Sequence, residues 1–280
     1  MSDDIAVVAC GSLRPLIESF VPDRPTAYVA HELHESPLDP GDDGAVTEAV
    51  QSAVDRCAAA EPRYVALAYA RSSRGLADVT ATTVPLAAWR APDCVDALCP
   101  RRVGPLGEAK QPGSYYLTPG GIAAGLDPYK LYLAYVGELD GLVESQQASG
   151  LSPDWHQGDR LTSLVADGPE PSPELVRSQF AMQFADYDRV VLLDTGQTDA
   201  AHRQHAIRLA RFLGSLRADD DPLPVEVRQA DLGRLRALLT GDALDRDDID
   251  VIQPGERVGE PLDSSRPHRP TIPRPINSHD

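Results

Sequence analysis

The sequence predicts an α/β fold in which helices cover both faces of a mostly parallel sheet, a three-layer, Rossmann-like arrangement. Two observations support this fold class. Short apolar runs typical of buried strands alternate with segments whose apolar residues recur at helical spacing. The chain of 280 residues, 42% of them hydrophobic, is also long enough to bury a large core. We expect a single α/β domain over residues 1–255 and a disordered tail over 256–280, where apolar residues are too few to pack.

The N-terminal part of the chain contains four predicted strands separated by turns and helices. The strands are expected at residues 5–9, 26–30, 64–69 and 83–88. A helix is expected near Arg14, and a second is indicated by apolar residues that recur on one helical face between 46 and 57. Pro92 suits the first turn of a third helix, which would place Cys94 near its start.

The C-terminal part shows the same alternation with one interruption. Strands are expected at residues 114–118, 189–193, 225–227 and 249–252. Pro119-Gly120-Gly121 predicts a turn, and Asp127-Pro128 predicts a helix start. Further helices are expected around residues 206–213 and 232–239. The segment 145–173 is polar and rich in Ser, Gly and Pro, so it is interpreted as a surface loop or insertion.

The charge balance excludes some classes of partner. The formal net charge of −17 repels phosphate backbones, so nucleic acid is not an expected partner. No apolar stretch is long enough to span a bilayer and no secretory signal precedes the first strand, so we expect a cytoplasmic protein. Only Lys110 and Lys130 are lysines. An acidic, lysine-poor chain is typical of a halophile's cytosol, in which salt screens the repulsion between carboxylates. The alternative is a high-GC codon bias, which also favours arginine over lysine.

Three residues that can bind a metal follow predicted strands. Cys10, His34 and Cys94 each lie just past a strand end, and parallel strands end at one edge of a sheet. Two thiolates and an imidazole are suitable ligands for zinc or another transition metal. Cys94, at a predicted helix start, is also the best candidate for a catalytic thiolate. The alternative is structural, because free cysteines are commonly buried as small apolar residues.

Other side chains at the same predicted edge complete the candidate site. Ser72, Ser73 and Arg74 follow the third strand, and Arg90 follows the fourth, so they are candidates for binding an anionic substrate. Tyr116 is a candidate proton or hydrogen-bond donor in catalysis. Phosphate-binding and dinucleotide-binding glycine motifs are absent from the sequence.

Several short motifs together resemble the family known as domain of unknown function 1638, which occurs in archaea and anaerobic bacteria. The resemblance covers most of residues 5–256. It rests on Ala9-Cys10-Gly11, Leu33-His34-Glu35, Arg74-Gly75-Leu76, Arg90 with Asp93-Cys94, Gly113 through Thr118, Asp194-Thr195-Gly196 and Pro254-Gly255. The chain departs from the family pattern at Ser72 and Ser73, where members often carry a cysteine, which removes a soft metal ligand. At Gly121, members tend to have a tryptophan.

The resemblance implies a role near corrinoid-dependent methyl transfer and one-carbon metabolism, with a methyltransferase as a candidate partner. Our leading hypothesis is a metal- or thiolate-based site that acts on a small molecule. The alternative is a non-catalytic accessory or cofactor-binding protein of a methyltransferase system. A third reading treats the cysteines as core residues of a structural or regulatory subunit. The sequence leaves the oligomeric state open.

Overall fold

The computed structural model describes residues 5–29, 43–69, 76–91, 93–100, 110–124, 127–136, 138, 172–241 and 248–259. These residues form two compact units. Unit 1 contains the described residues between 5 and 111 and between 229 and 259, and unit 2 contains those between 112 and 228. Unit 1 is therefore built from two separate stretches of the chain.

Unit 1 contains a five-stranded sheet in the order β2-β1-β3-β4-β8. Its strands are β1 (Ile5–Cys10), β2 (Thr26–Val29), β3 (Tyr64–Ala68), β4 (Leu86–Trp89) and β8 (Ile249–Ile252). The first four are parallel to their neighbours, and only β8 runs antiparallel, beside β4. Every residue of β1 and β3 is buried, as expected for strands covered on both faces.

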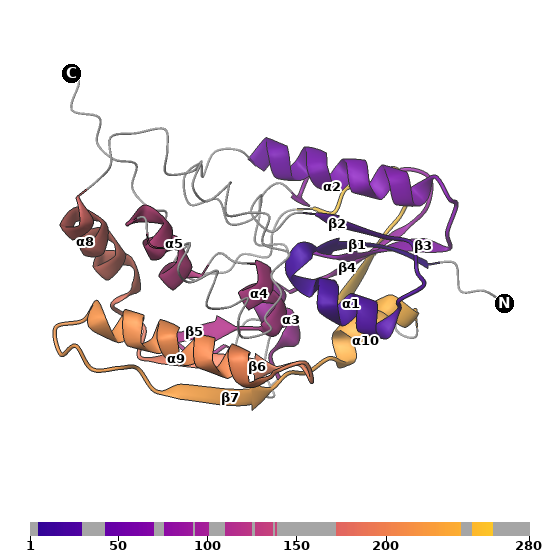
Figure 1. Ribbon diagram of the computed structural model, residues 1–280. Helices are drawn as coiled ribbons and strands as arrows, with labels where there is room; N and C mark the ends of the chain where they lie inside the picture. The colour runs from indigo at the N-terminus through magenta and orange to yellow at the C-terminus, as the bar shows by residue number, and fades with distance from the viewer. Residues whose placement is uncertain are drawn as a thin grey trace, which may run out of the picture. The chain divides into compact units, whose positions relative to one another are not determined.

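Helices cover both faces of this sheet (Figure 1). The long α2 (Asp43–Ala58) lies on one face, and α1 (Arg14–Phe20) and α10 (Gly233–Thr240) lie on the other. Alternate residues of β1, including Val8 and Cys10, join Val50 of α2 in one core cluster. On the opposite face, the hydroxyl of Tyr64 donates a 2.9 Å hydrogen bond to the carbonyl of Leu238 and fixes α10 to β3.

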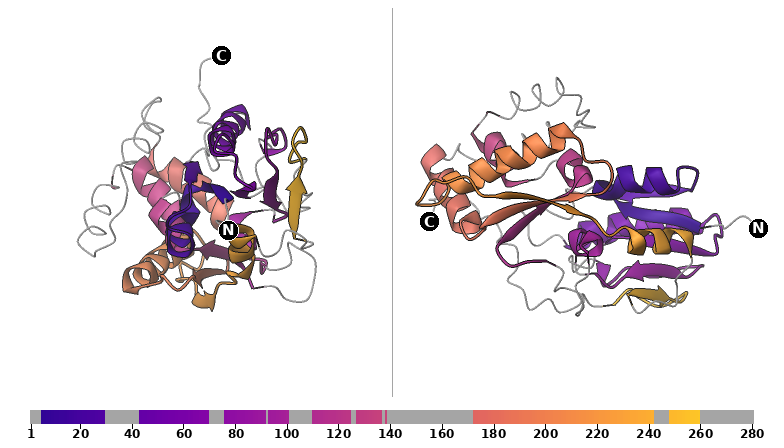
Figure 2. Two further views of the ribbon diagram at one scale, coloured as in Figure 1. Left: turned by 90° about the vertical axis from the view of Figure 1, so that its right-hand side faces the viewer. Right: turned by 90° about the horizontal axis from the view of Figure 1, so that it is seen from below.

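Unit 2 contains a second, three-stranded sheet in the order β5-β6-β7. Its strands are β5 (Ser114–Leu117), β6 (Arg189–Asp194) and β7 (Val225–Gln229), and β5 is parallel to β6. Its helices are α4 (Pro119–Ala124), α5 (Pro128–Tyr135), α8 (Pro173–Phe184) and α9 (Ala200–Ser215). The right-hand view of Figure 2 shows the long α9 running alongside these strands. An aromatic group of Tyr132, Phe180 and Phe212 joins α5, α8 and α9.

The structure confirms the predicted α/β class and its mostly parallel sheet, but the strands belong to two sheets rather than one. The single-domain boundary at residue 255 stays a prediction. The tail expected to be disordered over 256–280 is wrong for residues 256–259, which pack on unit 1: Val258 is buried and Arg257 forms a β-bridge with Thr80. Residues 260–280 lie outside the described residues, as does 145–171 of the expected loop. None of the described helices combines the length and the apolar character that a membrane span requires.

Two helices differ from the sequence-based expectation. The turn predicted at Pro119–Gly121 is wrong, because α4 begins at Pro119 and the Gly121 N–H donates to the Thr118 hydroxyl, 2.9 Å away. A proline followed by glycines suits the first turn of a helix as well as a free turn. The sequence pattern also missed α8, which Ser172 caps by accepting the Leu175 N–H.

A close backbone approach in unit 2 gives a test of packing. A methyl group at Gly214 of α9 would overlap the backbone carbonyl of Asp221. We expect Gly214→Ala to lower the free energy of unfolding by about 1–3 kcal/mol through overpacking, measured by chemical denaturation. Arg211→Ala, at an exposed position of the same helix, is the control and is expected to change it by less than about 0.5 kcal/mol. Equal effects of the two variants would contradict this packing.

Candidate functional site

The strand order of unit 1 creates one distinctive position at the carboxyl edge of its sheet. From β1 the chain passes to β2 on one side, and then through α2 to β3 on the other side of β1. The connections that leave the carboxyl ends of β1 and β3 therefore run in opposite directions. In open α/β sheets, the crevice at such a topological switch point is where ligands bind.

A thiol and a hydroxyl lie together at this switch point. Cys10 is the last residue of β1 and is fully buried. The short 3-10 turn η1 (Gly11–Leu13) follows directly, and it places the Ser12 hydroxyl 3.1 Å from the Cys10 sulfur. Ser12 is also buried. Sequence spacing indicated Cys10 but not its pairing with Ser12.

The second candidate cysteine begins a short helix after β4. Cys94 is the first residue of α3 (Cys94–Leu98), is partly exposed, and packs against the same core cluster that contains Cys10. Asp93 caps this helix by accepting the N–H of Asp96 at 2.8 Å. Both cysteines therefore belong to the face of the sheet that α2 covers.

Charged side chains surround the helix that carries Cys94. The ammonium of Lys110 donates to Asp93 and lies 3.7 Å from the buried carboxylate of Asp96. From α10, the buried guanidinium of Arg234 donates to the carbonyls of Asp96 and Cys99, at 3.0 and 2.7 Å. These contacts fix both ends of α3. Sequence reasoning missed Lys110, although the rarity of lysine in this chain was a usable signal.

The remaining predicted site residues are distributed as follows. Arg90 forms an ion pair with Asp250 of β8, with Nε 2.6 Å from the carboxylate, and its side chain is 44% exposed. Tyr116 is buried in β5, which belongs to unit 2, whereas Cys10 and Cys94 belong to unit 1. The other four, His34, Ser72, Ser73 and Arg74, lie outside the described residues.

The metal site stays a prediction. In the part of the chain that the structure describes, no group of three or more His, Cys, Asp or Glu side chains is arranged to hold a metal ion. The proposed third ligand, His34, is outside that part. It follows β2 in the sequence, and Val29 at the end of β2 pairs in register with Cys10.

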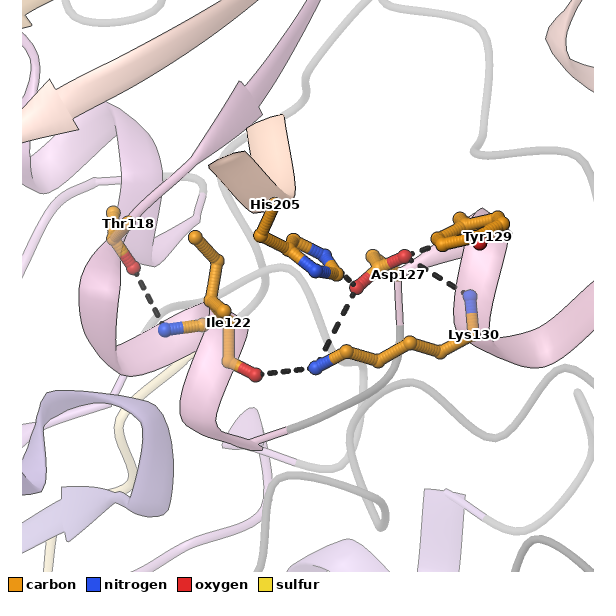
Figure 3. Close-up of polar contacts among 7 residues, drawn as sticks. Thr118, Ile122, Asp127, Tyr129, Lys130 and His205 are labelled. Atoms are coloured by element: carbon orange, nitrogen blue, oxygen red, sulfur yellow. Dashed lines mark hydrogen bonds and ion pairs between the residues drawn. The ribbon is translucent and has the colours of Figure 1, made fainter. Parts of the chain in front are cut away.

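Unit 2 contains a buried charged cluster that sequence reasoning missed (Figure 3). Asp127 caps α5 by accepting the N–H groups of Tyr129 and Lys130 at one carboxylate oxygen. The other oxygen lies 2.8 Å from Nε2 of His205 in α9 and 3.7 Å from the Lys130 ammonium. The Lys130 ammonium also donates to the carbonyl of Ile122 in α4, at 2.6 Å. The cluster therefore connects three helices.

Burial and charge shift two pKa values in this cluster. Burial lowers the pKa of Lys130 from 10.5 to about 8, and the nearby Asp127 carboxylate only partly offsets this effect. Burial alone would raise the pKa of Asp127, but the charge and hydrogen bond of His205, together with Lys130, outweigh it, and that pKa is lowered. The sequence marked Asp127 as a helix cap; its partner His205 lies too far along the chain to be recognised.

Comparison with known proteins gives a family. The profile of the family described as "Protein of unknown function (DUF1638)" matches residues 42–239, more than half of the chain. The chain belongs to the DUF1638 family. The DUF1638 match confirms the resemblance seen in the sequence, and its range includes Cys94, Asp127 and His205, whereas Cys10 precedes it. Searches of curated proteins and of solved structures found no match.

The burial of the cysteines predicts their reactivity. Cys10, Cys57 and Cys99 are buried, and burial raises the pKa of Cys57 and that of Cys99, the latter to about 12. Because thiolates are the reactive species, we expect Cys94 to react first with a disulfide reagent in the native protein. Timed labelling with mass spectrometry measures the order, and Cys94→Ser should remove the fast phase. Earlier labelling of Cys57 or Cys99 would contradict the assignment.

The buried cluster of unit 2 predicts a pH-dependent loss of stability. Asp127→Asn keeps the cap but leaves the buried Lys130 ammonium without its anion. We expect the free energy of unfolding at pH 7 to fall by about 3–5 kcal/mol. Because the folded pKa of Asp127 lies below 3.8, its contribution is present at neutral pH and is lost as the pH falls below that value.

Urea unfolding of wild type and Asp127→Asn at several pH values measures this effect, and the two curves should converge in acid. Glu18→Gln is the matched control, because Glu18 pairs with Arg14 at an exposed position of α1. Its expected effect is below about 1 kcal/mol. A loss for Asp127→Asn as small as that of the control would show that the cluster contributes little.

Proposed function

We propose that this DUF1638 protein binds a small molecule at the carboxyl edge of the unit 1 sheet and acts on it through the thiols of Cys10 and Cys94. The observation that carries this proposal is the strand order. It puts the adjacent thiol and hydroxyl of Cys10 and Ser12 at the switch point between β1 and β3. A buried thiol packed only as an apolar residue does not require a hydroxyl beside its sulfur.

The chemistry of the site is metal- or thiolate-based. Cys10, His34 and Cys94 supply the donor types that bind zinc, and a bound zinc ion would act as a Lewis acid or activate a bound thiol or water. Without metal, the partly exposed Cys94 is the nucleophile. The core cluster shared by Cys10 and Cys94 supports their acting together.

We expect an anionic group on the substrate, because arginines follow β3 and β4 in the sequence. Ser72, Ser73 and Arg74 follow β3, which is the other strand of the switch point, and Arg90 follows β4. A chain with a net charge of −17 repels anions elsewhere on its surface, so local guanidinium groups are needed to hold one. The family resemblance adds corrinoid-dependent one-carbon metabolism as the setting.

Metal analysis tests this proposal. Protein purified without chelators is analysed for bound metals as the wild type, as Cys10→Ala/Cys94→Ala, and as Cys57→Ala. Cys57 is a suitable control because it is buried on α2, where its sulfur lies 3.7 Å from the Val7 carbonyl. We expect the wild type and the control to retain a transition metal and the double variant to lose it. Metal retained by the double variant would contradict the metal form of the proposal.

The thiolate form is tested separately with a corrinoid. Wild type and both variants are titrated with methylcobalamin, and its absorbance reports binding and transfer of the methyl group to a cysteine thiolate, which leaves cob(I)alamin. Binding and demethylation that are retained by Cys57→Ala and lost in Cys10→Ala/Cys94→Ala would support the enzyme. Binding without turnover would instead assign the accessory role in a methyltransferase system. Identical behaviour of the wild type and the double variant in both assays would overturn the proposed site.

A further inference from the structure

The strand β7 forms one edge of the unit 2 sheet. Among the described residues it has β6 on one side and no strand on the other, and Figure 1 draws it at the lower margin of unit 2. None of its five residues is buried, whereas the four central residues of β6 are. Val227, at the centre of β7, is 44% exposed. An open edge of this kind is a template for pairing with another strand.

The backbone groups of β7 alternate between its two sides. The Val190 N–H of β6 donates to the carbonyl of Pro224, 3.0 Å away and directly before β7. Backbone groups of successive residues in a strand point to opposite sides, so those of Glu226 and Arg228 face β6. Those of Val227 face outward. The middle of the open edge therefore presents one N–H and one carbonyl.

The charges on this edge have an unusual arrangement. Charged side chains commonly protect an edge strand, because two copies of an edge with charges of one sign repel each other. The strand β7 instead carries one anion and one cation, Glu226 and Arg228, on either side of Val227 in the sequence. Within one chain these two residues pair with each other, with Nε of Arg228 3.0 Å from the Glu226 carboxylate. Because they are two residues apart in a strand, both side chains lie on one face of the sheet.

We infer that two copies of this chain pair antiparallel through β7, about a two-fold axis at Val227, and join two three-stranded sheets into one of six strands. In this register Val227 lies opposite Val227 of the second copy, and the two residues exchange both backbone hydrogen bonds. Their exposed side chains then lie side by side across the axis. Glu226 of each copy lies opposite Arg228 of the other. The inference is independent of the function proposed for unit 1.

Charge selects this register and this edge. Moving the axis by one residue, to Glu226 or to Arg228, would put two like charges directly opposite each other, which destabilises a strand pair. The other outermost strands of the described sheets are β2, β5 and β8. They carry a single charged residue between them, Asp250 of β8, so self-pairing gives them no pair of opposite charges.

Exchange of the two charges tests the pairing. Glu226→Arg puts a guanidinium opposite each Arg228, and Arg228→Glu puts a carboxylate opposite each Glu226, so either variant alone has two like-charge pairs across the axis. An equimolar mixture of the two variants has two opposite-charge pairs instead. Sedimentation velocity distinguishes the 30.1 kDa chain from its dimer. The salt concentration is about 0.15 M, where the Debye length of about 8 Å limits the general repulsion between two acidic chains.

We expect the wild type to sediment as a dimer. Each single variant should have a dimerisation constant weaker by about tenfold or more, and the mixture should recover the value of the wild type. Asp78→Arg is the matched control, because it makes the same change of charge as Glu226→Arg at an exposed position of unit 1. It should leave the dimer unchanged.

A proline at the axis tests the backbone part of the pairing. Val227→Pro removes the outward N–H, and an edge strand tolerates proline where the N–H faces away from the sheet. We expect this variant to be folded by circular dichroism and monomeric. A wild type that is monomeric at every concentration would overturn the inference. A dimer that both charge variants retain would also overturn it, as would single variants that stay monomeric when mixed.

Discussion

Parallel pairing on both sides of β1 is the constraint on which the rest of unit 1 depends. The first strand of the chain becomes an interior strand, with β2 on one side and β3 on the other. Each of its residues must then be apolar or small, because helices cover both faces, and all six are buried. The polar atoms that the chain carries at this place are therefore confined to the strand's carboxyl end. Cys10 ends β1 and Ser12 lies in the turn that follows it, so the thiol and the hydroxyl are both at this end of the strand.

In both units, a buried side chain from another element donates hydrogen bonds to carbonyls near the end of a short helix. Carbonyls in the last turn of a helix lack partners within the helix, so a buried helix end requires donors from elsewhere. Arg234 supplies them for α3, Lys130 for α4, and the hydroxyl of Tyr64 for α10. These long-range contacts stabilise the short helices α3 and α4, because isolated helices of this length are unstable in water. Buried polar side chains thus determine where these helices lie.

Local sequence patterns predicted those helices and strands whose own residues are sufficient to specify them without tertiary contacts. The apolar stripe of α9 was recognised because its burial follows helical periodicity. The strand at Ile249–Ile252 was recognised because it is a short run of mostly β-branched residues. The helix α8 escaped recognition because only Val176 and Phe180 of this helix are buried, while Met182 is 73% exposed. The division into two sheets could not be predicted, because pairing such as that of β5 with β6 joins residues far apart in sequence. The same limit applied to sites: Cys10 and Cys94 follow strands, but contacts such as that between Asp127 and His205 depend on tertiary packing.

The discontinuity of unit 1 bears on the order in which the molecule assembles during synthesis. All three strands of unit 2 come from one continuous stretch of the chain, so its sheet is complete before translation ends. Unit 1 begins earlier but needs α10 and β8, which leave the ribosome afterwards. Until they arrive, β4 is an uncovered sheet edge, and the face that receives α10 is exposed. The strand β8, in the last described segment of the chain, thus completes the sheet to which the first strand, β1, belongs.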